Sequence, residues 1–265
     1  MLAVCATPIG NLDDITLRVL AELRAADLVL AEDTRHTRGL LERHGIRARL
    51  LSYHEHNEAA RVAELLPRLQ AGERIALVSD AGMPAVSDPG ARLVRAALDA
   101  GIHVTVLPGP SAVETALVAS GLAGGRYAFV GFVPRKAGEL RELWRETAGW
   151  GCAVVAFESP HRLTATLRSL AGVDPEREVA VCRELTKRFE EVARGTAAEL
   201  ADRLVEPPKG EITLVIGPGS VVSDPESARQ AVADLVAAGT PRGVAADVVA
   251  RLSDTSRNDL YRGSL

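Results

Sequence analysis

Aromatic residues and cysteines are scarce in this sequence, and both shortages limit what the protein can be. Phenylalanine, tryptophan and tyrosine together make up 3% of the 265 residues, so we expect an aliphatic core and few surfaces on which a base could stack. The three cysteines, Cys5, Cys152 and Cys182, stand alone, each within an apolar run. This arrangement is typical of buried reduced thiols and argues against a disulfide or a zinc site.

Long hydrophobic runs and an excess of positive charge are also missing. The apolar runs are far shorter than the roughly 20 residues that cross a bilayer, and no basic region precedes the first of them, residues 2–6. We therefore expect a soluble, cytoplasmic protein that does not enter a membrane. The formal net charge of −4 argues against non-specific coating of nucleic acid, although a local basic patch is compatible with it.

Two glycine-rich signatures of nucleotide binding are absent as well. The chain begins with a strand pattern, a tight loop at residues 7–12 and a helix pattern, as a nucleotide-binding βαβ unit does, but the loop lacks G-x-G-x-x-G. No Gly-Lys-Ser/Thr loop for a triphosphate occurs either. These absences argue against a dinucleotide or a nucleoside triphosphate as the ligand.

Short apolar runs alternate regularly with amphipathic segments along most of the chain. Up to about residue 120 this alternation predicts a parallel, doubly wound α/β sheet. Further strand and helix patterns predict a second αβ domain, and a Gly-Pro-Gly-Ser linker separates it from a segment that reads as helices only. We therefore predict three parts: residues 1–120, residues 121–217 and a small helical tail, residues 225–265.

The chain is organised around residues 75–90, IALVSDAGMPAVSDPG. Residues 75–78 have the length and composition of a buried strand, and the polar, glycine-bearing loop 79–83 follows at its carboxyl end. Open α/β sheets bind ligands at that edge, so we expect residues 79–83 to contact a ligand. Residues 87–90 have a structural interpretation, in which Asp88 caps the next helix and Pro89 occupies its first position.

Two other loops share the character of residues 79–83. Residues 7–11 and residues 108–112 each follow a predicted strand and are small and backbone-presenting. At the carboxyl edge of one sheet the three loops would converge on a rim that suits adenine, ribose and an amino-acid carboxylate. Asp80 could bind a ribose hydroxyl or an ammonium group there, or cap its own turn. Ser111 is predicted to cap the helix that follows it.

Positive charge gathers in one window of this acidic chain. Between Arg35 and Arg49, five arginines and two histidines face a single acid, Glu42. Such a cluster can be a solvated basic face or a phosphate-binding surface. Further on, His54 and His56 are two apart on an extended segment, but no third ligand recurs at a diagnostic spacing, so we predict no metal site.

Seven motifs carry a resemblance to a known family: in chain order, ATPIGNLDDIT, AEDTR, SDAGMPAVSDPG, PGPSA, FVGFVPRK, ESPHR and CRELTK. Together they resemble the tetrapyrrole-methylase-like (class III) methyltransferases, and within them the members that methylate small-subunit ribosomal RNA. The resemblance runs from Met1 to about Ile216, and the helical tail is also similar. Met83 departs from the pattern, which has a small or hydroxylated residue at that place.

The resemblance implies S-adenosylmethionine as methyl donor, folded into a crevice between two αβ domains, and the 2′-hydroxyl of a decoding-region cytidine as acceptor. It also implies a homodimer that acts on small-subunit ribosomal RNA or the assembled small subunit. Carried over motif by motif, the cofactor contacts are Pro8, Ile9, Asp80, Gly82, Met83, Ser111, Ala112, Phe157 and Leu185.

Methyl transfer to a ribose hydroxyl is an in-line displacement, so most of the acceleration should come from holding the oxygen near the methyl group. The hydroxyl also needs a base, or a cation that lowers its pKa. Among the polar residues predicted at the crevice mouth, we favour Glu158 as the base and Lys136 as the cation. The candidate RNA contacts are Arg35, Arg38, His161, Arg162, Lys187 and Arg257.

Three functions compete at this point. An RNA ribose methyltransferase is favoured by the AEDTR and ESPHR motifs and by the basic window. A small-molecule methylase of the same fold is the second, and a non-catalytic cofactor-binding module, against which the polar rim argues, is the third.

The role of the helical tail has two interpretations as well. Arg257 and Tyr261 share a helix face that could meet RNA, or Leu260 and its neighbours could simply close a small core.

Overall fold

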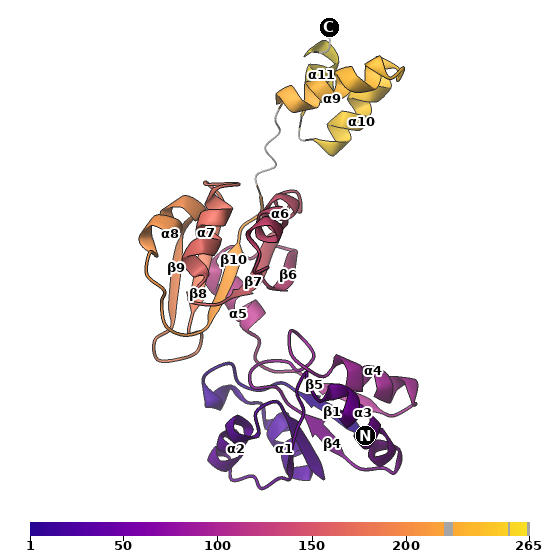
Figure 1. Ribbon diagram of the computed structural model, residues 1–265, viewed down its shortest axis with the longest axis vertical. Coiled ribbons are helices and arrows are strands. Elements are labelled where there is room, and N and C mark those ends of the chain that lie inside the picture. Colours follow the sequence, from indigo (N-terminus) through magenta and orange to yellow (C-terminus); the bar gives the residue numbers. More distant parts are fainter. Residues whose placement is uncertain (220–224, 254, 264–265) are drawn as a thin grey trace.

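The computed structural model describes residues 1–219, 225–253 and 255–263. Figure 1 shows two β-sheets, each accompanied by helices, followed by a group of three helices at the C-terminal end. Each sheet has five strands, in the orders β3-β2-β4-β1-β5 and β6-β7-β10-β8-β9. The predicted α/β class, with two αβ parts and a helical tail, is confirmed.

The first sheet is parallel throughout. Its strands are β1 (Leu2–Cys5), β2 (Leu28–Ala31), β3 (Leu50–Ser52), β4 (Ile75–Leu77) and β5 (Val104–Leu107). In the register, Ala3 of β1 lies opposite Ala76 on one side and Thr105 on the other. Because β1 lies between β4 and β5, the three loops that follow these strands leave neighbouring strand ends. This topology brings the three predicted ligand loops together.

Helices cover both faces of the first sheet, as the alternation predicted. Helices α1 (Leu17–Ala25) and α2 (Thr34–Arg43) pack through Val19, Leu23 and Leu40 on the face that presents Ala3 and Ala76. Helices α3 (Glu58–Gln70) and α4 (Ala91–Asp99) pack on the opposite face, where alternate strand residues such as Leu2 and Leu77 point. Because successive side chains of each strand point to opposite faces, the sheet contributes side chains to two separate hydrophobic cores.

The second sheet is mixed. Its strands are β6 (Tyr127–Phe132), β7 (Ala153–Glu158), β8 (Glu178–Arg183), β9 (Glu191–Thr196) and β10 (Ile212–Ile216). Only β6 and β7 run parallel within it, and the other neighbours pair antiparallel. Helices α6 (Ala137–Ala148), α7 (Leu163–Ala171) and α8 (Ala197–Arg203) bury Trp144, Leu167 and Leu200 on one face.

Helix α5 (Ala112–Ser120) covers the other face of the second sheet, although the chain enters it directly from β5 of the first. Val113 and Leu117 pack there against Val155 and Ala180. The helix therefore begins beside the loops of the first sheet and ends against the second, a path visible in Figure 1. This single element ties the two sheets together.

The C-terminal helices form a small core of their own. They are α9 (Pro225–Ala237), α10 (Arg242–Leu252) and α11 (Arg257–Gly263), and they pack around Val232, Ala246 and Leu260. The predicted break at residues 239–241 is confirmed, whereas Ser220 of the predicted linker and Asp254 of the second predicted break lie outside the described residues. In the described parts of the chain, no helix has both the length and the apolar character to cross a membrane.

Candidate functional site

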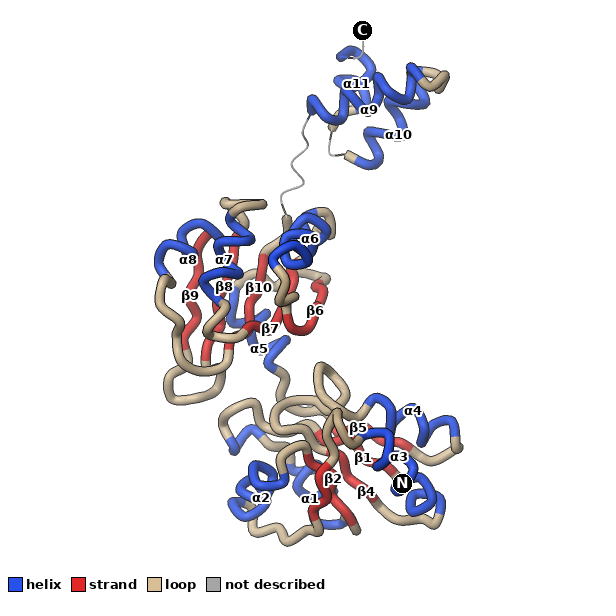
Figure 2. Tube along the Cα trace, viewed as in Figure 1, coloured by secondary structure: helices blue, strands red, loops and turns tan. Residues whose placement is uncertain are grey.

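A cavity of about 490 Å³ lies between the two sheets. The first sheet's side contributes Ile9, Glu32 and residues 80–83, 86–88 and 111–113, and the second contributes Phe132, Cys182, Leu185 and residues 157–160 and 210–213. Figure 2 shows the loops after the first sheet's strands gathered on the side nearest α5 and the second sheet. The cavity thus combines the carboxyl edge of the parallel sheet with one wall of the mixed sheet.

Hydrogen bonds join the loops after β1 and β4 where they line the cavity. Thr7 and Gly82 exchange two backbone hydrogen bonds, of 2.8 and 3.0 Å, and the Thr7 hydroxyl donates to the Ser79 carbonyl at 3.0 Å. Gly82 has a φ of +75°, which a residue with a side chain adopts only under strain. The Pro110 carbonyl lies within 4.0 Å of the place a Cβ would take. The three predicted loops therefore meet at Gly82.

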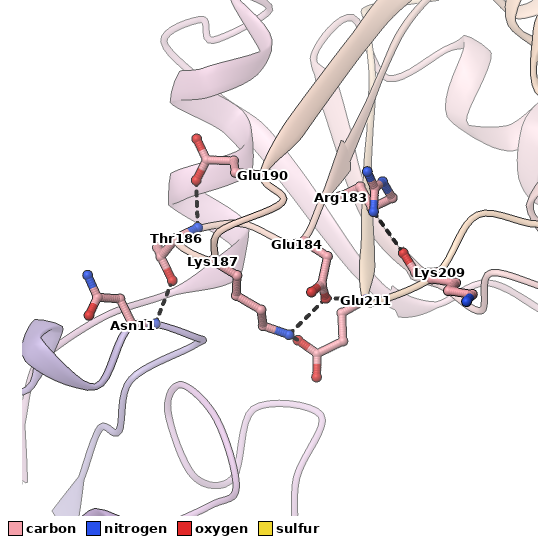
Figure 3. A network of polar contacts seen from close by, with 8 residues as sticks. All are labelled: Asn11, Arg183, Glu184, Thr186, Lys187, Glu190, Lys209 and Glu211. Carbon is pink, nitrogen blue, oxygen red and sulfur yellow. Dashed lines mark hydrogen bonds and ion pairs between the residues drawn. The ribbon is translucent and has the colours of Figure 1, made fainter. Parts of the chain in front are cut away.

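The loop after β8 closes the cavity against the first loop. The Asn11 backbone N–H donates to the Thr186 hydroxyl at 2.9 Å, and Lys187 forms ion pairs with Glu184 at 2.9 Å and Glu211 at 3.0 Å (Figure 3). A Cβ on Gly10 would lie 2.5 Å from the Lys187 side chain, 2.8 Å from the Thr186 hydroxyl and 2.9 Å from the Leu185 carbonyl. Only glycine permits this approach of the two domains.

Three carboxylates, Glu32, Asp80 and Asp88, reach the cavity from the first sheet. Asp80 accepts a hydrogen bond from the Asp33 backbone N–H at 3.0 Å, so it caps the chain after β2 and not its own turn. Burial, with the nearby Asp80 charge, raises the pKa of Glu32. Burial, followed by repulsion from Glu32 and Asp80, raises the pKa of Asp88 to about 7. This side of the cavity therefore suits a positively charged ligand.

Asp88 does not cap α4, and that prediction was wrong. Gly90 occupies the N-cap position with a φ of +137° and makes no side-chain cap. Before it, Ala85 (φ 68°) and Ser87 (φ 63°) turn the chain through left-handed conformations, so the helix starts too late for Asp88 to reach its first N–H groups. The Glu58 carboxylate accepts the Gly90 N–H at 2.8 Å instead. Residues 86–88 line the cavity as a result, and are not merely helix architecture.

The nine residues predicted to contact the cofactor nearly all lie at this cavity. Ile9, Asp80, Gly82, Met83, Ser111, Ala112, Phe157 and Leu185 line it, whereas Pro8 is buried and is not part of the lining. Ser111 stands at the N-cap of α5 as predicted, but its hydroxyl donates to the Glu114 carboxylate and makes no cap to the helix backbone. The sequence motifs and the geometry therefore point to the same place.

Proteins of known name match this chain along almost its whole length. The profile of the family "Tetrapyrrole (Corrin/Porphyrin) Methylases" matches residues 1–201. A "Ribosomal RNA small subunit methyltransferase I" of Mesorhizobium japonicum is 44% identical over 264 residues, which cover 98% of this chain and 90% of that protein. The chain belongs to this family of methyltransferases. A protein of the same name from Thermotoga maritima is 45% identical over 216 residues, 81% of this chain but 97% of that protein.

Solved structures of other tetrapyrrole methylases share the fold of this methyltransferase. The methyltransferase CobJ has a TM-score of 0.64 at 20% identity, covering 83% of this chain and 94% of CobJ. Uroporphyrin-III C-methyltransferase from Thermus thermophilus, in complex with S-adenosylhomocysteine, has a TM-score of 0.56 at 22% identity, covering 83% of this chain and 98% of that one. At these identities the likeness concerns the fold.

Glu158, the residue favoured as base, lines the cavity of this methyltransferase, but its carboxylate is already hydrogen-bonded to neighbouring groups. Its side chain is 0% exposed, and its oxygens accept from the Ser159 N–H at 2.6 Å and from the Thr166 hydroxyl. Arg162 pairs with it at 3.4 Å and also donates to the Val133 and Pro134 carbonyls. Because both carboxylate oxygens already accept hydrogen bonds from within the second domain, the geometry favours a structural role for both residues.

The other charged candidates are spread over the surface of this methyltransferase. Lys136 is 80% exposed, pairs with Glu139 at 2.8 Å and is not part of the cavity lining. Arg35 pairs with Asp33 at 2.7 Å, and Arg257 pairs with Asp247 at 2.5 Å. The remaining candidates are Arg38 and His161, which are exposed, and Lys187, which is engaged by two acids. The structure therefore does not bring the predicted RNA contacts together at one point.

All five arginines of the basic window are exposed, which places that charge on one helix and the loop after it.

The three cysteines are free, and Cys5 and Cys182 are buried, as predicted, while Cys152 is partly exposed. In the described residues no group of three or more histidines, cysteines or acids could hold a metal ion. Asp88 and Glu58 were not predicted to contribute to the site; Asp88 follows the predicted ligand loop 79–83 closely in the sequence, whereas no described lining residue lies near Glu58 along the chain.

Proposed function

We propose that this protein transfers a methyl group from S-adenosylmethionine to the 2′-hydroxyl of a cytidine in the decoding region of small-subunit ribosomal RNA. The observation that carries the proposal is the match, at 44% identity over 98% of the chain, to a relative named ribosomal RNA small subunit methyltransferase I. The cavity between the sheets supports it, because its lining comes from the motifs shared with that family.

The cavity residues fit S-adenosylmethionine. That molecule joins an adenine and a ribose to an amino acid through a positively charged sulfonium, and it supplies an electrophilic methyl group when bound. Glu32, Asp80 and Asp88 provide negative charge, while Ile9 and Phe157 provide apolar surface. The volume of about 490 Å³ lies within the range usual for small-molecule sites. In the fold neighbour from Thermus thermophilus, S-adenosylhomocysteine is bound.

RNA is the substrate that the exposed charge fits. The five arginines of the basic window lie on α2 and in the loop after it, and α2 begins two residues after Glu32 of the cavity. Arg35 and Arg38, in the part of α2 that begins beside the cavity, can hold phosphates there and position the acceptor ribose without reading a base, whereas Arg47 and Arg49 precede β3 at the opposite edge of the sheet. Held in line with the methyl group, the 2′-hydroxyl gains most of its reactivity from proximity.

We expect the protein to act as a cytoplasmic homodimer, because one cavity offers little surface to a structured RNA. Strand β5 is at the edge of its sheet, and its Val106 is 53% exposed. Apolar residues on an open strand edge favour pairing with another chain. Light scattering at micromolar concentration should give twice the mass of one chain, and a monomer mass would contradict this assembly.

Labelled methyl transfer distinguishes the proposed function from its alternatives. The purified protein receives methyl-labelled S-adenosylmethionine together with either unmodified small ribosomal subunits or tetrapyrrole precursors. We expect label in the RNA and none in the pigment. Label in the tetrapyrrole alone would support a small-molecule methylase, and tight cofactor binding with no transfer to either substrate would support a binding module.

A further inference from the structure

The loop at residues 85–88 forms one lip of the cavity mouth. Val86 is 49% exposed and Ser87 is exposed, yet both line the cavity together with Asp88. On the opposite lip, the position of a Cβ on Gly131 lies 3.5 Å from the Ser87 hydroxyl, and Phe132 also lines the cavity. Asp88 therefore lies on the cavity wall directly after two solvent-exposed residues, where an acceptor and a cofactor in the cavity could both reach it.

Three of the other carboxylates around the cavity are engaged by donors or cations, whereas Glu32 lies beside Asp80, and Asp88 itself is hydrogen-bonded only by the Ser79 side chain among the described residues. Glu158 is enclosed by its donors, Asp80 accepts the Asp33 N–H at 3.0 Å, and Glu211 pairs with Lys187 at 3.0 Å. Among the described residues, no arginine or lysine forms an ion pair with Asp88. The charged groups that act on Asp88 are Glu32 after β2 and Asp80 after β4. Glu158 and Glu211 line the same cavity from the second sheet, His54 acts on Glu32, and Arg92 on α4 lies 3.9 Å from Glu58 on α3.

Hydrogen bonds from α3 and the segment before it stabilise the conformation of the Asp88 loop. Ala85 and Ser87 adopt positive φ angles without being glycines, which costs energy that other contacts must offset. Glu58 supplies one such contact through the Gly90 N–H, and its carboxylate is fixed in turn by the buried Tyr53 hydroxyl at 2.9 Å. Strained loops held in this way are typical of sites that need a side chain at a fixed place.

We propose that Asp88 is the catalytic base that removes the proton from the acceptor hydroxyl. The inference rests on the proposed function. One Asp88 carboxylate oxygen takes the hydroxyl proton while the ribose oxygen forms its bond to the methyl carbon. The carbon–sulfur bond breaks, and its electron pair stays on sulfur, which leaves S-adenosylhomocysteine. The proton then passes from Asp88 to water.

The electrostatics of the site support this assignment. A general base is most effective when its pKa lies near the working pH, and burial together with Glu32 and Asp80 raises the pKa of Asp88 to about 7. A bound cationic cofactor would move this pKa downward, because an opposite charge favours the ionised carboxylate. Asp88 is then ionised, and able to accept a proton, at neutral pH.

Single-turnover methylation of small ribosomal subunits across pH 5.5–9 tests the role of Asp88. We expect the wild-type rate to rise with pH through the Asp88 pKa and then level off. Asp88→Asn should lower the rate roughly 100- to 10,000-fold and remove this rise, while cofactor affinity measured by calorimetry falls by no more than roughly tenfold, because one of the three carboxylates that face the cation loses its charge. Glu32→Gln should move the rise to lower pH, because it removes a negative charge beside Asp88.

Asp99→Asn is the matched control, since Asp99 lies on α4 as an exposed partner of Arg95 at 2.9 Å; its rate and pH profile should be those of the wild type. A wild-type rate in Asp88→Asn would overturn the inference alone. So would a rate loss matched by an equal loss of cofactor affinity with the pH profile unchanged, which would make Asp88 a cofactor ligand. Failure of the wild-type protein to methylate small subunits at any pH would overturn the proposed function, and the inference with it.

Discussion

At the scale of single residues, Asp88 links the pH to the stability of the fold. Its carboxyl binds a proton more tightly in the folded chain, with a pKa of about 7, than at its ordinary value of 3.8. The folded state therefore holds an extra proton between about pH 4 and pH 7, and stability falls as the pH rises through that window. Above pH 7 the ionised, partly buried Asp88 carboxylate lowers the stability of the folded protein.

Replacing Asp88 by asparagine should remove this cost. We expect the free energy of unfolding at pH 8 to increase by on the order of 1–3 kcal/mol. Near pH 4 we expect little change, because aspartic acid and asparagine at position 88 are both uncharged in the folded chain. Urea unfolding at the two pH values measures the difference. An equal change at both would show that the charge of Asp88 is not the cause.

Residue types alone could not reveal the position of Asp88. The Ser-Asp-Pro-Gly sequence matches a helix start, and nothing in it announces the positive φ angles of Ala85 and Ser87. The motif residues Asp80, Gly82 and Ser111 were predictable, because small residues after a buried strand mark the ligand edge of a parallel sheet. Glu158 was predictable as a cavity residue, but its hydrogen-bond partners depend on the folded arrangement of α7.

At the scale of elements, the joint between the two sheets depends on Gly10. Gly10→Ala places a methyl group against the Lys187 side chain, the Thr186 hydroxyl and the Leu185 carbonyl. Because the last of these belongs to the backbone, the loop 184–187 must move and the cavity wall with it. We expect at least a tenfold loss of cofactor affinity, measured by calorimetry, in a protein that still folds.

Gly39→Ala provides the control for that change. Gly39 lies within α2, and a Cβ there meets nothing within 4 Å. Alanine should therefore stabilise the protein by roughly 0.5–1 kcal/mol and leave cofactor affinity unchanged. If Gly10→Ala behaved in the same way as Gly39→Ala, the contact at Gly10 would not control the cavity.

The individual elements were largely readable from the sequence, whereas their arrangement was not. The bounds of α5 and β6 agree with the apolar patterns, since strand and helix periods are local. The strand order β3-β2-β4-β1-β5 and the packing of α5 on the second sheet depend on long-range contacts. A local pattern carries no information about such contacts.

At the scale of the whole molecule, the C-terminal helices are separable from the cavity. Their core of Val232, Ala246 and Leu260 is their own, and the Thermotoga maritima relative of the same name is 97% covered by only 81% of this chain. Arg257 pairs with Asp247, and Arg242 lies over the Tyr261 ring at 4.9 Å. The burial of Leu260 confirms that this segment closes a core, and RNA docking by the outer face stays a prediction.

A protein that ends at Gly219 tests docking by the tail. We expect it to stay folded, to keep its cofactor affinity and to methylate small subunits with a raised KM and a similar kcat, because the tail would hold substrate and not take part in the chemistry. Circular dichroism, calorimetry and steady-state kinetics measure these three properties. An unchanged KM would exclude the docking role.

The central proposal concerns the product, so nucleoside analysis of the product tests it most directly. Unmodified small subunits are incubated with the protein and S-adenosylmethionine, and their RNA is digested to nucleosides and examined by mass spectrometry. We expect one new modified nucleoside, 2′-O-methylcytidine, approaching one per subunit, and only a small fraction of that yield with Asp88→Asn in the same incubation time. A methyl group on a base, or on the ribose of a nucleoside other than cytidine, would contradict the proposal.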